Sequence, residues 1–312
     1  MTDLAAGLNR RDRRALAKAL TLAENKPSEA EKLFPSLESP NTEPLTVGLT
    51  GAPGTGKSTL IKALLDCALK EGQKVCVLAV DPSSPFSGGS LLADRHRMTL
   101  SNFDPTKVFI RSLSSRGHLG GLSPGASVGL RLAKLYDFDL IILETVGVGQ
   151  AEIEVLYLAD LIAVTLVSGL GDEIQAMKSG LMEIADVFIV NKCKRPQTEE
   201  LVADLEGLLS ESPRYKGVGW KPTILQTEAL SGEGISELWK FLRDAPLDPL
   251  FQEHQKSRQE RQLYQQAFQS VMNHYRERTV EALNEIDFGG YSANRVHELS
   301  KEILRRNGER EG

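Results

Sequence analysis

Short apolar stretches alternate with longer amphipathic stretches through the middle of the chain. The apolar stretches predict strands at Leu45–Leu49, Val75–Val80, Val108–Ile110, Leu140–Leu143, Leu161–Val167, Val187–Val190 and Thr223–Gln226. Helical spacing predicts helices at Lys57–Lys70, Ser127–Leu135, Asp172–Ile184, Glu199–Leu209 and Ile235–Leu242. Apolar strands separated by helices are typical of a mostly parallel sheet that helices cover on both faces. The pattern therefore predicts an α/β domain over residues 44–246.

Both ends of the chain show helical periodicity instead. Apolar residues recur at helical spacing over residues 3–34, which predicts an N-terminal helical extension over residues 1–43. Residues 251–286 are charged, rich in glutamine and free of Gly and Pro, and they carry one apolar stripe. The stripe includes Phe268, Val271, Met272 and Tyr275. Such a stripe must be buried, so the helical arm 247–312 either packs on its own domain or makes a dimer or partner contact.

Charge and cysteine content narrow the function classes. The net charge is −5 and the isoelectric point is about 5.7, so no nucleic-acid partner is expected. The arginines at 10, 11, 13 and 14 are interrupted by Asp12 and are expected on a solvated helix face. Three cysteines without metal-type spacing indicate neither disulfides nor zinc. The chain has no apolar run of membrane-spanning length and no signal-peptide pattern, so a cytoplasmic protein is expected, with no membrane partner.

One glycine-rich segment carries a specific chemistry. It reads Gly-Ala-Pro-Gly-Thr-Gly-Lys-Ser from Gly51 to Ser58, matches G-x-x-x-x-G-K-[ST], and lies between a predicted strand and a predicted helix. Glycines let backbone N–H groups surround a phosphate, and the helix N-terminus adds its dipole. We expect Lys57 to reach the β- and γ-phosphates and Ser58 to bind magnesium. The expected nucleotide contacts in this P-loop are Gly51, Ala52, Pro53, Gly54, Thr55, Gly56, Lys57, Ser58 and Thr59.

Two acidic residues follow predicted strands beside this loop. Asp81 ends the strand at Val75–Val80, and Glu144 ends the strand at Leu140–Leu143. An acidic residue at a strand end can be a helix cap or a turn former. Two such residues beside a P-loop are better explained as ligands of magnesium and water, because metal sites form at the carboxyl ends of parallel strands.

The combination of motifs resembles the MeaB/ArgK family of P-loop GTPases, which are chaperones of cobalamin-dependent enzymes and include the human methylmalonic aciduria type A protein. The resemblance runs from the helix at Arg14–Glu24 to about Leu242. Its specific marks are Val80-Asp-Pro-Ser-Ser84, Gly88-Gly-Ser90, Glu144-Thr-Val-Gly-Val-Gly-Gln150 and Gly171-Asp-Glu173.

The resemblance implies a mechanism and partners. It implies GTP as substrate, a homodimer through the C-terminal helices, and an adenosylcobalamin-dependent acyl-CoA mutase of the methylmalonyl-CoA mutase type as partner. It assigns Ser58, Asp81, Asp94 and Glu144 to the magnesium shell. It also makes Gly169–Gly180 a mobile switch whose Lys178 acts in catalysis with Lys57 and Glu144. The stretch from Arg111 to Gly121 is also family-like, and no physical role follows from its residues.

The sequence departs from the family at the base site. Guanine is normally recognised by Asn-Lys-x-Asp, in which the aspartate accepts hydrogen bonds from the base. Here the motif reads Asn191-Lys192-Cys193-Lys194, and losing the acceptor should cost about 2–4 kcal/mol. The family's Ser-Ala in the next base loop is Glu228-Ala229 here. Either these are two unrelated surface changes, or Glu228 replaces the lost acceptor or pairs with Lys194.

Three functions are consistent with these observations. The first is a GTPase switch that serves a cobalamin-dependent mutase. The second is a P-loop ATPase or kinase that has lost guanine specificity, although the sequence has no arginine-rich lid insertion of the kinase type. The third is a nucleotide-binding scaffold with little turnover. Turnover with GTP and ATP, with and without a mutase, separates them.

Overall fold

The computed structural model describes residues 2–40, 42–81, 103–114, 124–145, 156, 158–169, 184–211, 219–260 and 263–264, with only the backbone at positions 81, 114 and 124. The chain divides into two compact units, Met1–Lys256 and Ser257–Gly312. The sheet and the helices that cover it belong to the first unit. The boundaries near residues 43 and 246 remain predictions about domain organisation.

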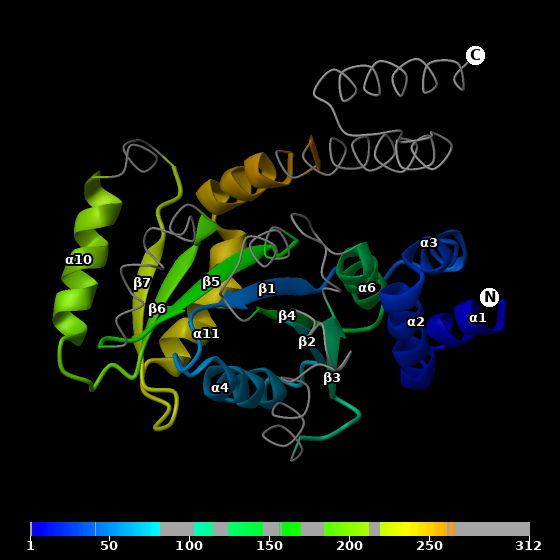
Figure 1. The fold of residues 1–312 in the computed structure, drawn as a ribbon, viewed down its shortest axis with the longest axis horizontal. Coiled ribbons are helices and arrows are strands. Elements are labelled where there is room, and N and C mark those ends of the chain that lie inside the picture. Colours follow the sequence, from blue (N-terminus) through cyan, green and yellow to red (C-terminus); the bar gives the residue numbers. More distant parts are fainter. Residues whose placement is uncertain are drawn as a thin grey trace, which may run out of the picture. The chain divides into compact units, whose positions relative to one another are not determined.

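Seven parallel strands in the described part of the chain form one sheet (Figure 1). They are β1 (Leu45–Thr50), β2 (Val75–Asp81), β3 (Val108–Ser114), β4 (Leu140–Thr145), β5 (Leu161–Leu166), β6 (Val187–Asn191) and β7 (Thr223–Thr227). Their order is β3-β2-β4-β1-β5-β6-β7, so β1 is central and pairs with β4 and β5. The predicted α/β fold with a parallel sheet is confirmed.

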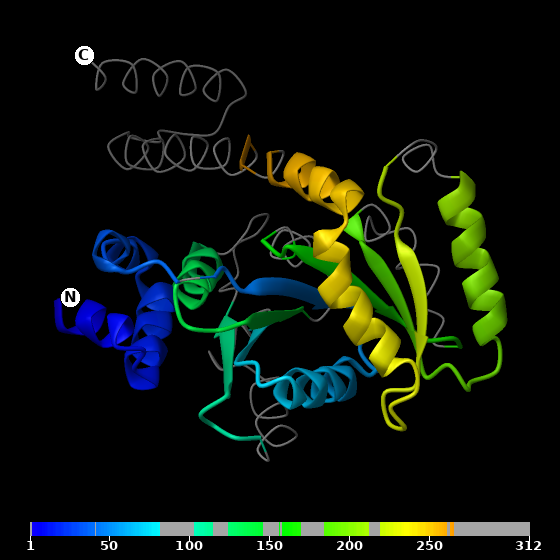
Figure 2. The ribbon, with the colours of Figure 1, turned by 180° about the vertical axis from the view of Figure 1, so that it is seen from behind.

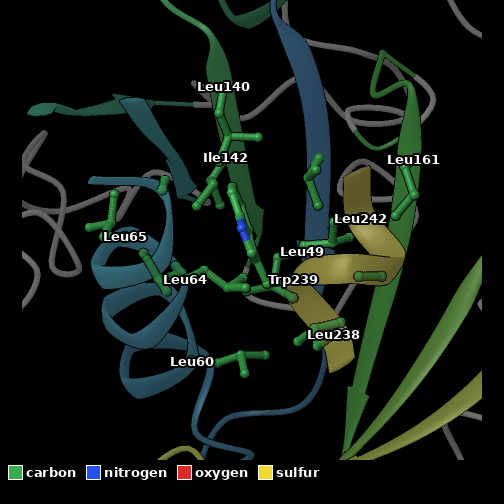
Figure 3. Packing of buried hydrophobic residues seen from close by; sticks show 14 of the residues in the cluster. Leu49, Leu60, Leu64, Leu65, Leu140, Ile142, Leu161, Leu238, Trp239 and Leu242 are labelled. Carbon is green, nitrogen blue, oxygen red and sulfur yellow. The ribbon is translucent and has the colours of Figure 1, made fainter. Parts of the chain in front are cut away.

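Helices cover both faces of the sheet (Figures 1 and 2). On one face, α4 (Lys57–Lys70) and α11 (Ile235–Asp244) pack on alternate strand residues such as Leu49 and Ile142 (Figure 3). On the other face, α6 (Pro124–Lys134) covers β2 and β4, and α10 (Thr198–Glu211) covers β5 and β6. Because successive strand residues are buried on opposite faces, the strands are apolar throughout, as the sequence indicated.

The N-terminal helical region is three short helices followed by a 3₁₀ turn. They are α1 (Thr2–Asn9), α2 (Arg13–Asn25), α3 (Pro27–Glu31) and η1 (Phe34–Ser36). The break before α2 lies at Arg11, whose φ is +59°, and Asp12 caps α2 by accepting from the N–H of Arg14. Pro27 opens α3 because a helix tolerates proline in its first turn.

Two of the N-terminal arginines hold these helices against the end of α6 and against β3. Arg11 donates to the carbonyl of Leu135 at 2.6 Å, and the Arg13 guanidinium donates to the Val108 carbonyl and lies over the Phe109 ring. The expected solvated arginine face is therefore wrong for these two residues. Sequence spacing gave no sign of this role, because the acceptors are backbone carbonyls about a hundred residues away in the chain.

The helical segment 249–260 begins on the first unit, after η3 (Ala245–Leu247). Phe251 is fully buried and contacts Trp220 edge-on at 4.8 Å between ring centroids. His254 lies 3.2 Å from the Asp186 carboxylate, which also accepts from the N–H of Ile162. This end of the arm is thus anchored to the sheet edge where the strands begin. In the described part of the chain, no helix is both long enough and apolar enough to span a membrane.

Candidate nucleotide site

The predicted nucleotide-binding residues follow the carboxyl ends of the strands. The P-loop follows β1, Asp81 ends β2 and Glu144 lies near the end of β4. Glu144 pairs with Leu49 of β1 on one side and with Ala79 of β2 on the other. Since parallel strands end at one edge, the sheet brings the phosphate loop and both predicted acidic positions together.

The P-loop backbone needs glycine at two positions. Gly51 has φ +144°, and a Cβ there would lie 2.2 Å from the carbonyl oxygen of Thr165 in β5. Gly56 has φ +92°, and a Cβ there would lie 2.5 Å from the Asn191 amide nitrogen. Gly56 also precedes α4, and no described side chain caps that helix. Its first N–H groups therefore point into the loop, which is the arrangement that binds phosphate.

The Lys57 ammonium lies against the loop it follows. Its Nζ donates to the carbonyl of Gly51 at 2.5 Å and to that of Ala52 at 3.1 Å, and the residue is 8% exposed. The structure therefore places the Lys57 ammonium against the backbone of the P-loop. Ser58, the second residue of α4, is half-buried.

The base motif is bonded directly to the P-loop. Asn191, which is buried, donates from Nδ2 to the Thr55 carbonyl at 2.8 Å, and Lys192 Nζ donates to the Gly54 carbonyl at 2.8 Å. The Asn191 side-chain oxygen accepts from the Thr227 hydroxyl and from the N–H of Ala229. One side chain therefore joins the phosphate loop, the end of β6 and the loop after β7.

Lys194 pairs with a residue that the sequence did not single out. Its Nζ lies 2.8 Å from Oε2 of Glu233, and this hydrogen bond and the charge of Glu233 raise the pKa of Lys194. Of the alternatives that the sequence left open, the pairing of Lys194 with Glu228 is wrong, because Glu233 takes that place in the structure. Glu228 is held instead through its backbone, whose N–H donates to the Glu233 carbonyl at 2.9 Å.

The acidic positions have the donor chemistry of a magnesium site. Glu144 is 3% exposed at the end of β4, and carboxylate and hydroxyl oxygens are the ligands that magnesium prefers. The side chains of Asp81 and Asp94 lie outside the described residues. No cluster of three or more His, Cys, Asp and Glu among the described side chains would hold a metal by itself. Magnesium in phosphate sites normally takes few protein ligands, with waters and phosphate oxygens as the rest.

Comparison with known proteins identifies the family. A family model described as "Methylmalonyl Co-A mutase-associated GTPase MeaB" matches residues 16–282. This chain belongs to the MeaB family. It is therefore a P-loop GTPase, and the resemblance seen in the sequence is confirmed.

Two of the relatives of this MeaB-family protein described here are named as GTPases. A Pyrococcus horikoshii protein named as a GTPase is 43% identical over 243 residues, which cover 78% of this chain and 76% of that one. The Escherichia coli GTPase ArgK is 38% identical over 248 residues, which cover 76% of this chain and 73% of ArgK. The mouse mitochondrial homologue of the methylmalonic aciduria type A protein is 36% identical over 263 residues, which cover 77% of this chain and 62% of the mouse protein. A solved structure described as a LAO/AO transport system kinase covers 97% of each chain at a TM-score of 0.67 and 26% identity.

Several predicted site residues of this MeaB-family GTPase lie outside the described residues. They are Asp94, Lys178 with the rest of the switch after Gly169, and residues 115–121 of the Arg111–Gly121 stretch. Arg111 itself is described, and it pairs with Glu24 of α2 at 2.8 Å. That contact joins β3 to the N-terminal helices, away from the P-loop.

Sequence reasoning missed two features of the site. Glu233 lies in the turn after β7 and, as a surface glutamate beside Gly232 and Gly234, looks like an ordinary turn residue. The hydrogen bond from Asn191 to Thr55 could not be predicted from the sequence either, since 136 positions separate the two residues. The signal in the sequence was Lys194 itself, because a cation in place of the motif's aspartate calls for an acidic residue nearby. Only the fold shows that Glu233 is this acidic residue.

Proposed function

We propose that this chain is a magnesium-dependent GTP switch that acts as a chaperone of an adenosylcobalamin-dependent acyl-CoA mutase. The observation that carries the switch is the joining of the base motif to the phosphate loop through Asn191 and Lys192. Base and phosphate sites built as one unit suit a protein that recognises a whole nucleotide. The family description, which names a mutase-associated GTPase, supports the partner.

The phosphate end would act through a small set of groups. Lys57 and the N–H groups at the start of α4 would hold the phosphates, while Ser58, Asp81, Asp94 and Glu144 would hold magnesium directly or through water. Bound magnesium would lower the charge repulsion between phosphate oxygens and an attacking water. The Glu144 side chain would lie beside that water, and Lys178 of the Gly169–Gly180 switch would reach the phosphates when the partner is bound.

The test of the switch uses methylmalonyl-CoA mutase as the partner. We expect the two proteins to form a complex in size-exclusion chromatography, and the mutase to raise the GTP hydrolysis rate at least about tenfold, since a partner that orders a catalytic switch acts on the transition state. The complex with GDP should differ in affinity from that with a non-hydrolysable GTP analogue. No complex with either nucleotide would contradict the chaperone role, while hydrolysis by the chain alone would leave the GTPase intact.

The ATPase alternative rests on one observation, the cation at position 194 of the base motif. Equal turnover of ATP and GTP by the chain alone would favour it. Turnover of GTP at a rate at least about a hundred times that of ATP would exclude it, because this ratio needs about 2.7 kcal/mol of base discrimination.

We also propose that the C-terminal arm forms a homodimer, since its apolar stripe at Phe268–Tyr275 must be buried. Light scattering should show a dimer for the full chain and a monomer for a chain that ends after Glu260. The cut is placed there because a shorter chain would lose the buried Phe251 and the His254–Asp186 contact. The control is nucleotide affinity, which should be unchanged. A truncated chain that stays dimeric would contradict the assignment.

A further inference from the structure

Two carboxylates are carried by one closed turn where the base loops meet. Glu228 and Glu233 form an isolated antiparallel bridge, and Gly232 donates its N–H to the Glu228 carbonyl at 2.9 Å. Gly234 closes the turn at φ +71°, where a Cβ would lie 2.0 Å from the Gln226 carbonyl oxygen. The turn therefore has a defined shape, and both carboxylates project from it at fixed backbone positions.

This turn is fixed to the end of β6 as well as to β7. The N–H of Ala229 donates to the Asn191 side-chain oxygen at 3.2 Å, and the N–H of Cys193 donates to the Thr227 carbonyl at 3.0 Å. Asn191 in turn is bonded to the P-loop. The carboxylate-bearing turn consequently holds a set position relative to both the base motif and the phosphates.

Charges gather around Cys193, in the middle of the base motif. The N–H of Cys193 donates to the carbonyl of Thr227, the residue before Glu228, and Cys193 directly precedes Lys194, the partner of Glu233. Burial raises the pKa of the Cys193 thiol, and the charges of Glu233 and Glu228 raise it further. Lys194 is bonded to Glu233 at 2.8 Å. Two carboxylates and one ammonium leave one net negative charge, which is the charge that the aspartate of Asn-Lys-x-Asp would have placed there. A site with this charge still attracts the N1–H and amino donors of guanine.

The two carboxylates are not equivalent. Glu233 is occupied by Lys194. The half-buried Glu228 side chain makes no hydrogen bond or ion pair with another described residue. Glu228 also directly precedes Ala229, which is held against Asn191. Both carboxylates lie beside the base motif, and Glu228 is the one that has no ion-pair partner among the described residues.

We propose that Glu228 is the residue that recognises guanine, accepting from N1–H and the 2-amino group, and that Glu233 neutralises Lys194 and holds its ammonium away from Glu228. The acceptor has thus moved from the loop after β6 to the loop after β7. This inference rests on the proposed GTP-binding function and names the groups that would set its base specificity.

The experiment is calorimetry on the full chain with magnesium and GDP, IDP, XDP or ADP. Glu228→Gln should weaken GDP about 30-fold to 300-fold, because an amide accepts from only one of the two guanine donors and sets its own N–H against the other. The same change should strengthen XDP, whose 2-carbonyl accepts from the new amide, and should leave ADP unchanged. IDP lacks the amino group, so its loss should be smaller than that of GDP. The Glu228→Asp variant, one methylene shorter, should weaken GDP without strengthening XDP.

The matched control is Glu233→Gln, which makes the same chemical change at the other carboxylate of the same turn. It frees Lys194, so GDP should weaken less than about tenfold, with no gain for XDP. The double variant Lys194→Gln with Glu233→Gln should return to within about threefold of wild type, since the Glu228 carboxylate remains. Unchanged GDP affinity in Glu228→Gln, or a gain for XDP in Glu233→Gln, would overturn the assignment.

The outcomes also separate this inference from the proposed function. Wild-type protein that binds ADP as tightly as GDP would refute guanine recognition and leave the phosphate site standing. Wild-type protein that binds none of the four diphosphates would refute the nucleotide switch itself.

Discussion

Lys57→Ala should abolish measurable binding of GTP to the full-length protein, with affinity falling at least about a thousandfold. The Lys57 ammonium is buried against the Gly51 and Ala52 carbonyls, where it faces the phosphate loop. A charge-assisted contact to a triphosphate in a partly buried site contributes several kcal/mol, and about 4 kcal/mol corresponds to a thousandfold change. Calorimetry with a non-hydrolysable GTP analogue measures the effect directly.

The control for this variant is Lys62→Ala. Lys62 lies on the same helix and is exposed, so its substitution removes the same charge from a position outside the loop. It should leave GTP affinity within about twofold of wild type, because an exposed charge is screened by solvent and salt. Wild-type affinity in Lys57→Ala, with a normal unfolding transition, would show that this loop does not bind the phosphates.

Glu144→Gln should lower the GTP hydrolysis rate by about two to four orders of magnitude while GDP affinity stays nearly unchanged. The carboxylate lies at the end of β4, between β1 and β2, and is almost fully buried. Groups that act on the metal shell or the attacking water matter chiefly in the transition state, so their loss lowers turnover more than binding. Asp81→Ala should behave in the same way, since Asp81 ends the neighbouring strand.

Single-turnover hydrolysis at saturating GTP and magnesium measures this effect, and Asp137→Asn is the control. Asp137 is an exposed carboxylate paired with Lys74, and both residues precede strands, at the opposite end of the strands from the P-loop. Its change should leave the rate within about twofold of wild type. If Glu144→Gln and Asp81→Ala both hydrolyse GTP normally, the magnesium shell belongs to other residues.

Much of the fold was predictable because its signals are local. The range of α4 agrees with its prediction, and six of the seven strands begin and end within two residues of theirs. β3 is the exception: it continues to Ser114, beyond the predicted end at Ile110. Residues Arg111 and Ser112 interrupt the apolar run there, and pairing with β2 supplies the backbone hydrogen bonds that carry the strand on. Edge positions accept polar side chains, so hydrophobicity alone ends the prediction early.

The phosphate site was equally predictable, since the P-loop is one contiguous segment whose glycines are needed by its own backbone. Gly51 and Gly56 show this, with positive φ values and no room for a Cβ. The base site was not, because its parts come from three places in the sequence. In the sequence, Lys194 is a cation in a motif that normally has an aspartate there, and only the fold shows that Glu233 pairs with it.

The sequence by itself determined the parallel α/β architecture, the position of the phosphate loop and the strand-end location of Glu144, because periodicity and strand–loop–helix order are properties of neighbouring residues. Only the tertiary structure decided how the base loops are held and where their charges pair. Asn191 donates to Thr55, which is 136 positions away in the chain, and Lys194 pairs with Glu233 rather than Glu228. The physical reason is that these contacts depend on which strand ends lie side by side and on the shape of the turn after β7, and neither is recorded in local spacing.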